Sequence, residues 1–198
     1  MLNVILVCLL AYLAGSVNFA VLFFKMTGRD DPRLHFSGNA GTTNVYRQAG
    51  MLWAVLILVL DIGRALAVAA AACYYITTGD GWLVWTGFFL ILGNSFPCFH
   101  GFRGGKGVAS YLGFTALIVP CAALFAAIAW VLVYAVMRVP FIASFFMVAL
   151  LSIGHSLSFH WTPPATTAAG ATFALIIFNH RMNIRQYRKD RQLSAQEQ

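Results

Sequence analysis

Charged residues are scarce in this 198-residue sequence: Asp, Glu, Lys and Arg make up 10% of it, against about 25% in an average soluble domain. Hydrophobic residues make up 60%, so the chain has too few polar side chains to cover a water-soluble globule. The 17 Phe, 7 Tyr and 5 Trp exclude intrinsic disorder, because disordered chains are poor in aromatic residues. The composition predicts an all-α polytopic integral membrane protein.

Several chemical motifs are also missing. The 4 cysteines are scattered without a CxxC pair, which excludes a disulfide scaffold and leaves no zinc-ligand spacing. No GxSxG elbow occurs, which disfavours a hydrolase-type serine nucleophile. No His is followed five positions later by Asp, which excludes an HxxxxD dyad. We expect neither a metal site nor a cofactor.

Long apolar runs predict the membrane spans. The run from 108 to 137 is divided at Pro120, since proline interrupts a helix and an even number of crossings must separate two basic segments. The part that begins at Val108 is too short to span alone, so we expect it to be buried by protein. A five-helix arrangement, with part of 139–179 re-entrant, is the alternative. The predicted seven helices are 1–24, 51–76, 82–99, 108–119, 121–137, 139–160 and 166–178, with a turn at 78–81.

Basic residues predict the orientation. The formal net charge is +7, but its placement between apolar runs follows the positive-inside rule and argues against nucleic-acid binding. We expect an extracellular N-terminus and a cytoplasmic C-terminus, in a single domain over 1–198 whose polar cytoplasmic tail, 188–198, is frayed. The three basic segments contain Lys25, Arg29, Arg33 and Arg47; Arg103 and Lys106; and Arg181, Arg185, Arg188, Lys189 and Arg191.

Three segments on this predicted cytoplasmic side are rich in hydrogen-bond donors. Residues 35–47 combine hydroxyls, amides, glycines and an arginine just before a helix, and 102–108 places three glycines and two cations ahead of another. Such loops bind oxyanions through backbone N–H groups and helix N-termini. The second lacks the GxxxxGK[ST] spacing of a nucleotide P-loop. Residues 179–185 add an imidazole, an amide and two guanidinium groups. Each segment has a structural alternative. For 35–47 it is an N-capping turn, for 102–108 a membrane-proximal turn with snorkelling cations, and for 179–185 an interfacial histidine.

Together these segments resemble the motifs of the membrane-bound, acyl-phosphate-dependent glycerol-3-phosphate acyltransferases of bacteria. The family patterns GSGNxGATNVxR, GHxFPxFxxFKGGKGVA and HRxNIxR are similar to FSGNAGTTNVYR at 36–47, GNSFPCFHGFRGGKGVA at 93–109 and HRMNIRQ at 180–186. The family also has an LDxxKG segment, which corresponds to 60–65. The chain departs from the family at Asn94 (His), Arg64 (Lys), Gln186 (Arg) and Gln192 (Glu).

The resemblance implies transfer of an acyl group from acyl-phosphate to the 1-hydroxyl of glycerol-3-phosphate in the bacterial cytoplasmic (inner) membrane, giving lysophosphatidate and phosphate. The partners would be these two substrates and membrane lipids. A divergent anion transporter or a non-catalytic lipid-binding protein is the alternative, because intramembrane Asp61 and Arg64 suit a pathway or a paired structural site.

The resemblance also implies roles for individual residues. Ser37, Thr43 and the Gly104–Gly107 backbone would hold acyl-phosphate, and Arg47 and Lys106 would neutralise phosphoryl charge. His180, Arg181 and Asn183 would hold glycerol-3-phosphate, and either His180 or a substrate phosphate oxygen would take the proton. The implied catalytic residues are Ser37, Arg47, Lys106, His180 and Asn183, and the implied substrate-binding residues are Gly38, Asn39, Thr43, Asn44, Arg103, Gly104, Gly105, Gly107 and Arg181.

Overall fold

The computed structural model describes residues 1–76 and 81–196, and over these residues the chain is helical without strands. The all-α prediction is confirmed. The predicted turn at 78–81 lies almost wholly outside the described residues. The helices are α1 (Leu2–Ser16), α2 (Phe19–Met26), α3 (Thr42–Ala49), α4 (Met51–Tyr75), α5 (Leu83–Ser95), α6 (Val108–Ile118), α7 (Pro120–Met137), α8 (Pro140–Ser158), α9 (Pro163–Asn179) and α10 (Arg181–Gln196), with short 3-10 turns at Pro32–Leu34 and Cys98–His100.

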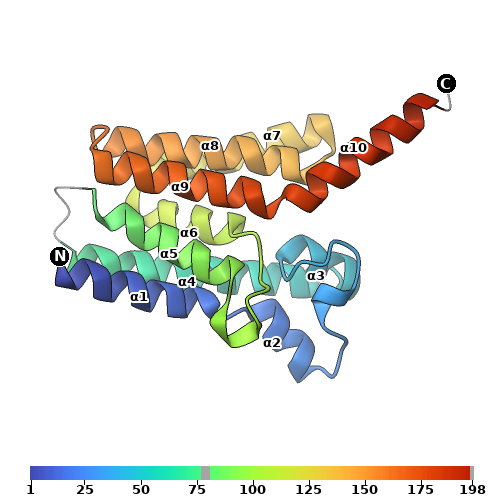
Figure 1. The fold of residues 1–198 in the computed structure, drawn as a ribbon, viewed down its shortest axis with the longest axis horizontal. Helices are drawn as coiled ribbons and strands as arrows, with labels where there is room; N and C mark the ends of the chain where they lie inside the picture. Colours follow the sequence, from blue (N-terminus) through green and yellow to red (C-terminus); the bar gives the residue numbers. More distant parts are fainter. Residues whose placement is uncertain (77–80, 197–198) are drawn as a thin grey trace.

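The apolar helices form a bundle with roughly parallel axes, while α2, α3 and α10 gather at one end of it (Figure 1). Five helical segments in the described residues are long and apolar enough to cross a membrane. The shorter α6, with 11 residues, and α9, with 17, complete the bundle. The predicted division into seven apolar segments therefore holds, and the number that cross the bilayer stays a prediction. Both α8 and α9 are unbroken, so the re-entrant alternative gains no support.

The division at Pro120 is confirmed. Helix α6 ends at Ile118, and Pro120 is the first residue of α7. Proline suits this position because the first N–H of a helix has no partner within the helix in any case. The short α6 also begins at Val108 as predicted, directly after Gly107, whose φ of 85° favours glycine. This boundary sets the second donor-rich loop against the N-terminus of α6.

The first predicted span is wrong as a single continuous helix. Helix α1 ends at Ser16 and α2 starts at Phe19. The side chain of Asn18 accepts a hydrogen bond from the Val21 N–H at 3.0 Å and so caps α2. Arg64 of α4 donates to the carbonyl oxygen of Val17. Partners from Asn18 and α4 thus satisfy backbone groups that the break releases.

Two further boundaries differ from the prediction. Residues 42–49 form α3 and not a loop, with Gly50 at φ 90° separating it from α4. Thr43, Asn44 and Arg47 therefore lie on a short helix. The expectation of a frayed tail is also wrong, because α10 continues through Gln196.

Side-chain pairs one turn apart support the tail helix. Gln186 donates to Asp190 at 2.7 Å, and the Arg191 guanidinium lies 5.5 Å from the centre of the Tyr187 ring. Pairs at this spacing stabilise an exposed helix. The polar tail is therefore helical as part of α10, which follows α9 after His180 and continues through Gln196.

The bundle geometry sharpens the topology prediction. The loops that precede α3 and α6 lie with α10 towards one end of the bundle, and the starts of α1 and α9 lie at the other (Figure 1). The first group of segments contains residues 40, 104 and 188, and the second contains residues 2 and 163. In a variant lacking the native cysteines, single cysteines at 2 and 163 should react with an impermeant maleimide in intact cells, whereas those at 40, 104 and 188 should react only after lysis. Labelling of position 188 in intact cells would contradict a cytoplasmic C-terminus. We also expect a cysteine at position 79 to react in intact cells, but this position lies outside the residues that the structure describes.

Candidate active site

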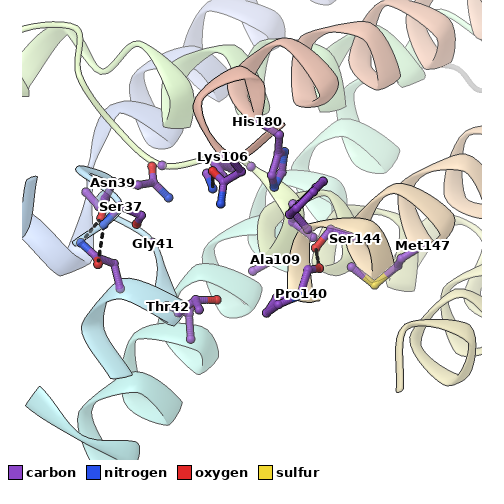
Figure 2. Close-up of a pocket in the computed structure, with 18 of the residues that line it drawn as sticks. Ser37, Asn39, Gly41, Thr42, Lys106, Ala109, Pro140, Ser144, Met147 and His180 are labelled. Carbon is purple, nitrogen blue, oxygen red and sulfur yellow. Dashed lines mark hydrogen bonds between the residues drawn. The ribbon is translucent and has the colours of Figure 1, made fainter. Parts of the chain in front are cut away.

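A cavity of about 770 Å³ lies where the three donor-rich segments meet. Figure 2 shows Lys106 and His180 reaching into it between the loop that carries Ser37 and the helix α8 that carries Ser144. Segments far apart in the sequence therefore share one space. Of the predicted site residues, the cavity is lined by Ser37, Asn39, Thr43, Asn44, Arg47, Gly105, Lys106, Gly107, His180 and Asn183.

The cavity has two chemically different parts. The part formed by the loops, α3 and the start of α10 carries cations, hydroxyls and amides. The part between α4, α6, α7 and α8 is lined mainly by apolar side chains, among them Leu58, Leu112, Trp130, Val131 and Met147. An amphiphilic ligand with an anionic head and a hydrocarbon tail matches this combination.

Asn44 shapes the first loop. The residue is 1% exposed, and its amide nitrogen donates to the carbonyls of Pro32 at 2.7 Å and Asn39 at 2.9 Å. Its amide oxygen accepts from the Ser37 N–H at 3.5 Å. Because these amide groups are engaged within the loop, Asn44 places Ser37 and Asn39 at the cavity (Figure 2).

The second donor-rich segment, 102–108, is called the glycine loop, and it is held in place by hydrogen bonds to α5. The N–H groups of Gly104 and Gly105, which the resemblance assigns to acyl-phosphate, donate instead to the carbonyls of Ser95 at 3.1 Å and Asn94 at 2.8 Å. The N-terminus of α6 remains as the part of this loop that could bind an anion, since Gly107 and Val108 line the cavity there. The loop thus aims a helix terminus and Lys106 at the same space.

Lys106 joins the second segment to the third. Its ammonium donates to the amide oxygen of Asn183 at 2.5 Å. Burial, and then the nearby Arg47 cation, lower the pKa of Lys106 to about 8. Two cations from separate segments therefore repel each other, and an anion between them would relieve that repulsion.

His180 is a buried, neutral imidazole. Burial, and next the Lys106 charge, lower its pKa to about 4. Its Nδ1 lies 2.8 Å from the carbonyl oxygen of Ile176. A carbonyl only accepts, so Nδ1 carries the proton and Nε2 keeps its lone pair. The ring also packs edge-on against Phe145 at 5.2 Å between centroids, which fixes its orientation.

Backbone and side-chain hydrogen bonds hold the three segments and their neighbours together. The Ala40 N–H donates to the Gly104 carbonyl at 3.4 Å. Asn179 donates to the Ser95 hydroxyl at 2.8 Å, and Arg33 donates to the Arg103 carbonyl at 2.7 Å. The Arg33 guanidinium lowers the pKa of Asp31, its ion-pair partner at 2.5 Å. The three segments therefore form one hydrogen-bonded unit at one end of the bundle.

Four predicted residues do not line the cavity: Gly38, Arg103, Gly104 and Arg181. The Arg103 side chain is exposed. Arg181 is also exposed, and its guanidinium lies over the Phe178 ring at 4.2 Å, where it stabilises the end of α9. Their positions at the membrane boundary fit the charge pattern, and we assign them no contact with substrate.

Sequence reasoning missed several polar residues in the cavity wall, notably Asp61, Asn94 and Ser110. Asp61 and Arg64 were conspicuous as charges within an apolar run, but nothing in the sequence indicated that α4 brings them to the loops. Among the described residues, no group of His, Cys, Asp and Glu could hold a metal ion.

The chain was compared with known proteins. Residues 5–190 match the family model described as glycerol-3-phosphate acyltransferase. The glycerol-3-phosphate acyltransferase of Pseudomonas fluorescens strain Pf0-1 is 38% identical over 183 residues, covering 91% of this chain and 93% of the relative. That of Azotobacter vinelandii strain DJ is 36% identical over 179 residues, covering 90% and 93%.

Solved structures give the same result. The crystal structure of PlsY (YgiH), an integral membrane glycerol 3-phosphate acyltransferase, in its glycerol 3-phosphate form superposes with a TM-score of 0.87 at 32% identity, covering 95% of this chain and 93% of that one. Its lysophosphatidic acid form gives 0.84 at 31%, with the same coverage. Because fold and sequence agree over nearly the whole length, this chain belongs to the glycerol-3-phosphate acyltransferase family of integral membrane proteins.

Proposed function

We propose that this chain transfers a fatty acyl group from acyl-phosphate to the 1-hydroxyl of glycerol-3-phosphate, giving lysophosphatidate and phosphate as a step of phospholipid biosynthesis. The observation that carries the proposal is one cavity with a cationic part next to an apolar part. The solved relatives are described in glycerol 3-phosphate and lysophosphatidic acid forms. Both molecules carry a phosphate that Arg47 and Lys106 could neutralise.

An acyl-phosphate donor fits the charges of the site. Transfer breaks the bond between the acyl carbon and the phosphate oxygen, so the negative charge that the donor phosphate already carries increases beside the acceptor phosphate. The N-terminus of α6 and the Lys106 ammonium would stabilise the leaving phosphate, while Arg47 would hold the acceptor. Because the anhydride is already activated, positioning and charge stabilisation supply the acceleration.

The proposed step is a direct displacement. The 1-hydroxyl oxygen of glycerol-3-phosphate attacks the acyl carbonyl carbon, an ester bond forms, and the phosphate leaves with the bonding electron pair. The hydroxyl proton passes to Nε2 of His180 or to a substrate phosphate oxygen. Asn183, held by Lys106, and Ser37 supply polar groups for the reacting oxygen atoms.

Donor specificity is tested directly with purified protein in liposomes. Labelled glycerol-3-phosphate is supplied with palmitoyl-phosphate, palmitoyl-CoA or palmitoyl-carrier protein, and labelled lysophosphatidate is measured. We expect product with palmitoyl-phosphate alone. Product formed only with palmitoyl-CoA would reject the donor assignment, and uptake of label without any product would identify a transporter.

The pH dependence should follow Lys106. The site needs the ammonium form, so kcat/KM for glycerol-3-phosphate should fall above pH 8, the approximate pKa of Lys106 in the free protein. The substrate phosphate is a dianion throughout this range, because its second pKa is about 6. Lys106→Arg should move the limb to higher pH. A parent profile that stays flat to about pH 10 would contradict the role of Lys106.

We expect no acyl-enzyme intermediate, because the donor is pre-activated. Replacing Cys8, Cys73, Cys98 and Cys121 together with Ala should keep turnover within about tenfold, the loss coming from packing. Mass spectrometry of protein quenched during turnover should find no thioester. An acyl group trapped on any of the four would overturn direct displacement.

The same reasoning extends to location and architecture. We propose a bacterial cytoplasmic membrane, with the loop end of the bundle in the cytoplasm and 1–198 acting as one catalytic domain. The cavity end carries most of the basic residues, as the positive-inside rule requires.

A further inference from the structure

Arg64 is a cation in the middle of α4, with a side chain that is only 7% exposed. One guanidinium nitrogen, Nη2, donates to Asp61 at 2.9 Å, to Asn94 at 3.1 Å and to Ser110 at 3.0 Å. These acceptors come from α4, α5 and α6. All three line the cavity, whereas Arg64 itself lies behind the wall.

The other end of the guanidinium is anchored elsewhere. Nη1 donates to the carbonyl of Gly15 at 3.4 Å and to that of Val17, at the break between α1 and α2. The guanidinium also lies 5.3 Å from the centre of the Phe19 ring. A planar group held at both ends has little freedom to rotate, so Arg64 is a fixed reference for the residues that it contacts.

Asn94 connects Arg64 to the glycine loop through two hydrogen bonds. Its side-chain oxygen accepts from Arg64, and its backbone carbonyl accepts from the Gly105 N–H at 2.8 Å. A Cβ added at Gly105 would lie 2.8 Å from the Asn94 side-chain nitrogen, so the loop is packed directly on this amide. Lys106 is the next residue. A displacement of Asn94 would therefore displace the cation that faces the phosphate.

We propose that Arg64 and Asn94 form one positioning pair for the proposed acyl transfer, in which the length of one side chain complements the length of the other. Arg64 is long and forked while Asn94 is short, and the two meet at 3.1 Å. With Arg64→Lys and Asn94→His combined, a shorter, unforked side chain would face a longer one, so contact between the two positions could be kept. The inference rests on the proposed function, and it assigns Arg64 a positioning and not a catalytic role.

The experiment is a double-mutant cycle on the complete protein in liposomes, with palmitoyl-phosphate and labelled glycerol-3-phosphate. We expect Arg64→Lys and Asn94→His each to lower kcat about tenfold or more, with a smaller change in KM, because Lys106 shifts relative to bound substrate. The kcat of the double variant should be about tenfold or more higher than the value expected if the two single losses multiplied. Arg29→Lys is the matched control, since Arg29 is exposed, and its kcat should equal that of the parent.

The pH profile separates positioning from simple stability. The alkaline limb of the kcat/KM profile reports the pKa of Lys106. Its midpoint should therefore differ from that of the parent in each single variant and match that of the parent in the double variant. Additive single effects, or parent-level kcat in Arg64→Lys, would overturn the proposal. If Arg64→Lys does not accumulate, recovery of folded, active protein in the double variant supports the pair, and failure to recover overturns it. An inactive parent would instead reject the proposed function, and the inference with it.

Discussion

Lys106→Ala is expected to lower kcat by a factor on the order of 10²–10³, the loss typical when one preorganised oxyanion donor is removed. The Lys106 ammonium faces a cavity shared with Arg47 and His180. Without it, the charge that grows on the leaving phosphate keeps only the α6 N-terminus of the two groups assigned to it, because Arg47 is assigned to the acceptor phosphate. The Asn183 amide oxygen would lose its donor as well, so the glycerol-3-phosphate pocket would loosen at the same time.

Arg138→Gln is the matched control for this prediction. Arg138 is also basic and lies at the same end of the bundle, but it is exposed, caps α7 and does not line the cavity. Its replacement should leave kcat near the parent value once protein amounts are equalised. Equal losses in the two variants would mean that both cations serve membrane topology, and Lys106 would have to be removed from the site.

Gly104→Ala is expected to be the most damaging small substitution in the glycine loop, although Gly104 itself does not line the cavity. A Cβ at position 104 would lie 2.1 Å from the Asn94 carbonyl oxygen and 2.7 Å from the Pro97 ring. The loop would have to move away, which breaks the Gly105 N–H bond to Asn94 and displaces Lys106. A displacement of about 1 Å at a reacting centre can cost on the order of 10² in rate, and we expect a loss of that size in kcat.

Gly101→Ala is the control that distinguishes steric crowding at position 104 from the loss of any glycine in this connection. Gly101 belongs to the same connection and has φ 64°, but a Cβ there would meet nothing within 4 Å. Alanine should add only about 1–2 kcal/mol of backbone strain and leave kcat within a few-fold of the parent. Thermal unfolding of both variants should be measured beside turnover. If Gly104→Ala keeps parent-level kcat, the glycine loop does not position Lys106.

The sequence predicted the parts of this fold that depend on local rules. Proline at 120 and the glycine-rich segment that ends at 107 favour helix boundaries through their own backbone properties, so the limits of α6 could be placed in advance. The three donor-rich segments also carried their chemistry in their composition. Their common position at one end of the bundle followed from the charge pattern.

The features that could not be predicted depend on contacts between distant residues. The break at Val17 is satisfied by Arg64, 47 residues further along the chain. The Ser110 contact of Arg64 spans 46 residues. Nothing near Gly104 in sequence reveals that its N–H group is taken by Ser95. Periodicity and composition describe a helix but not its neighbours, so the polar wall behind the site appeared only in three dimensions.

The break between α1 and α2 has a consequence for the order of assembly in the membrane. The carbonyls of Gly15 and Val17 receive hydrogen bonds from a side chain of α4, which is synthesised later. An unsatisfied backbone group in hydrocarbon costs several kcal/mol, so before α4 arrives the first span is most stable as one unbroken helix. The chain would then take its broken form only when the second span inserts beside it, and the loop that α2 leads into could not reach its working position earlier.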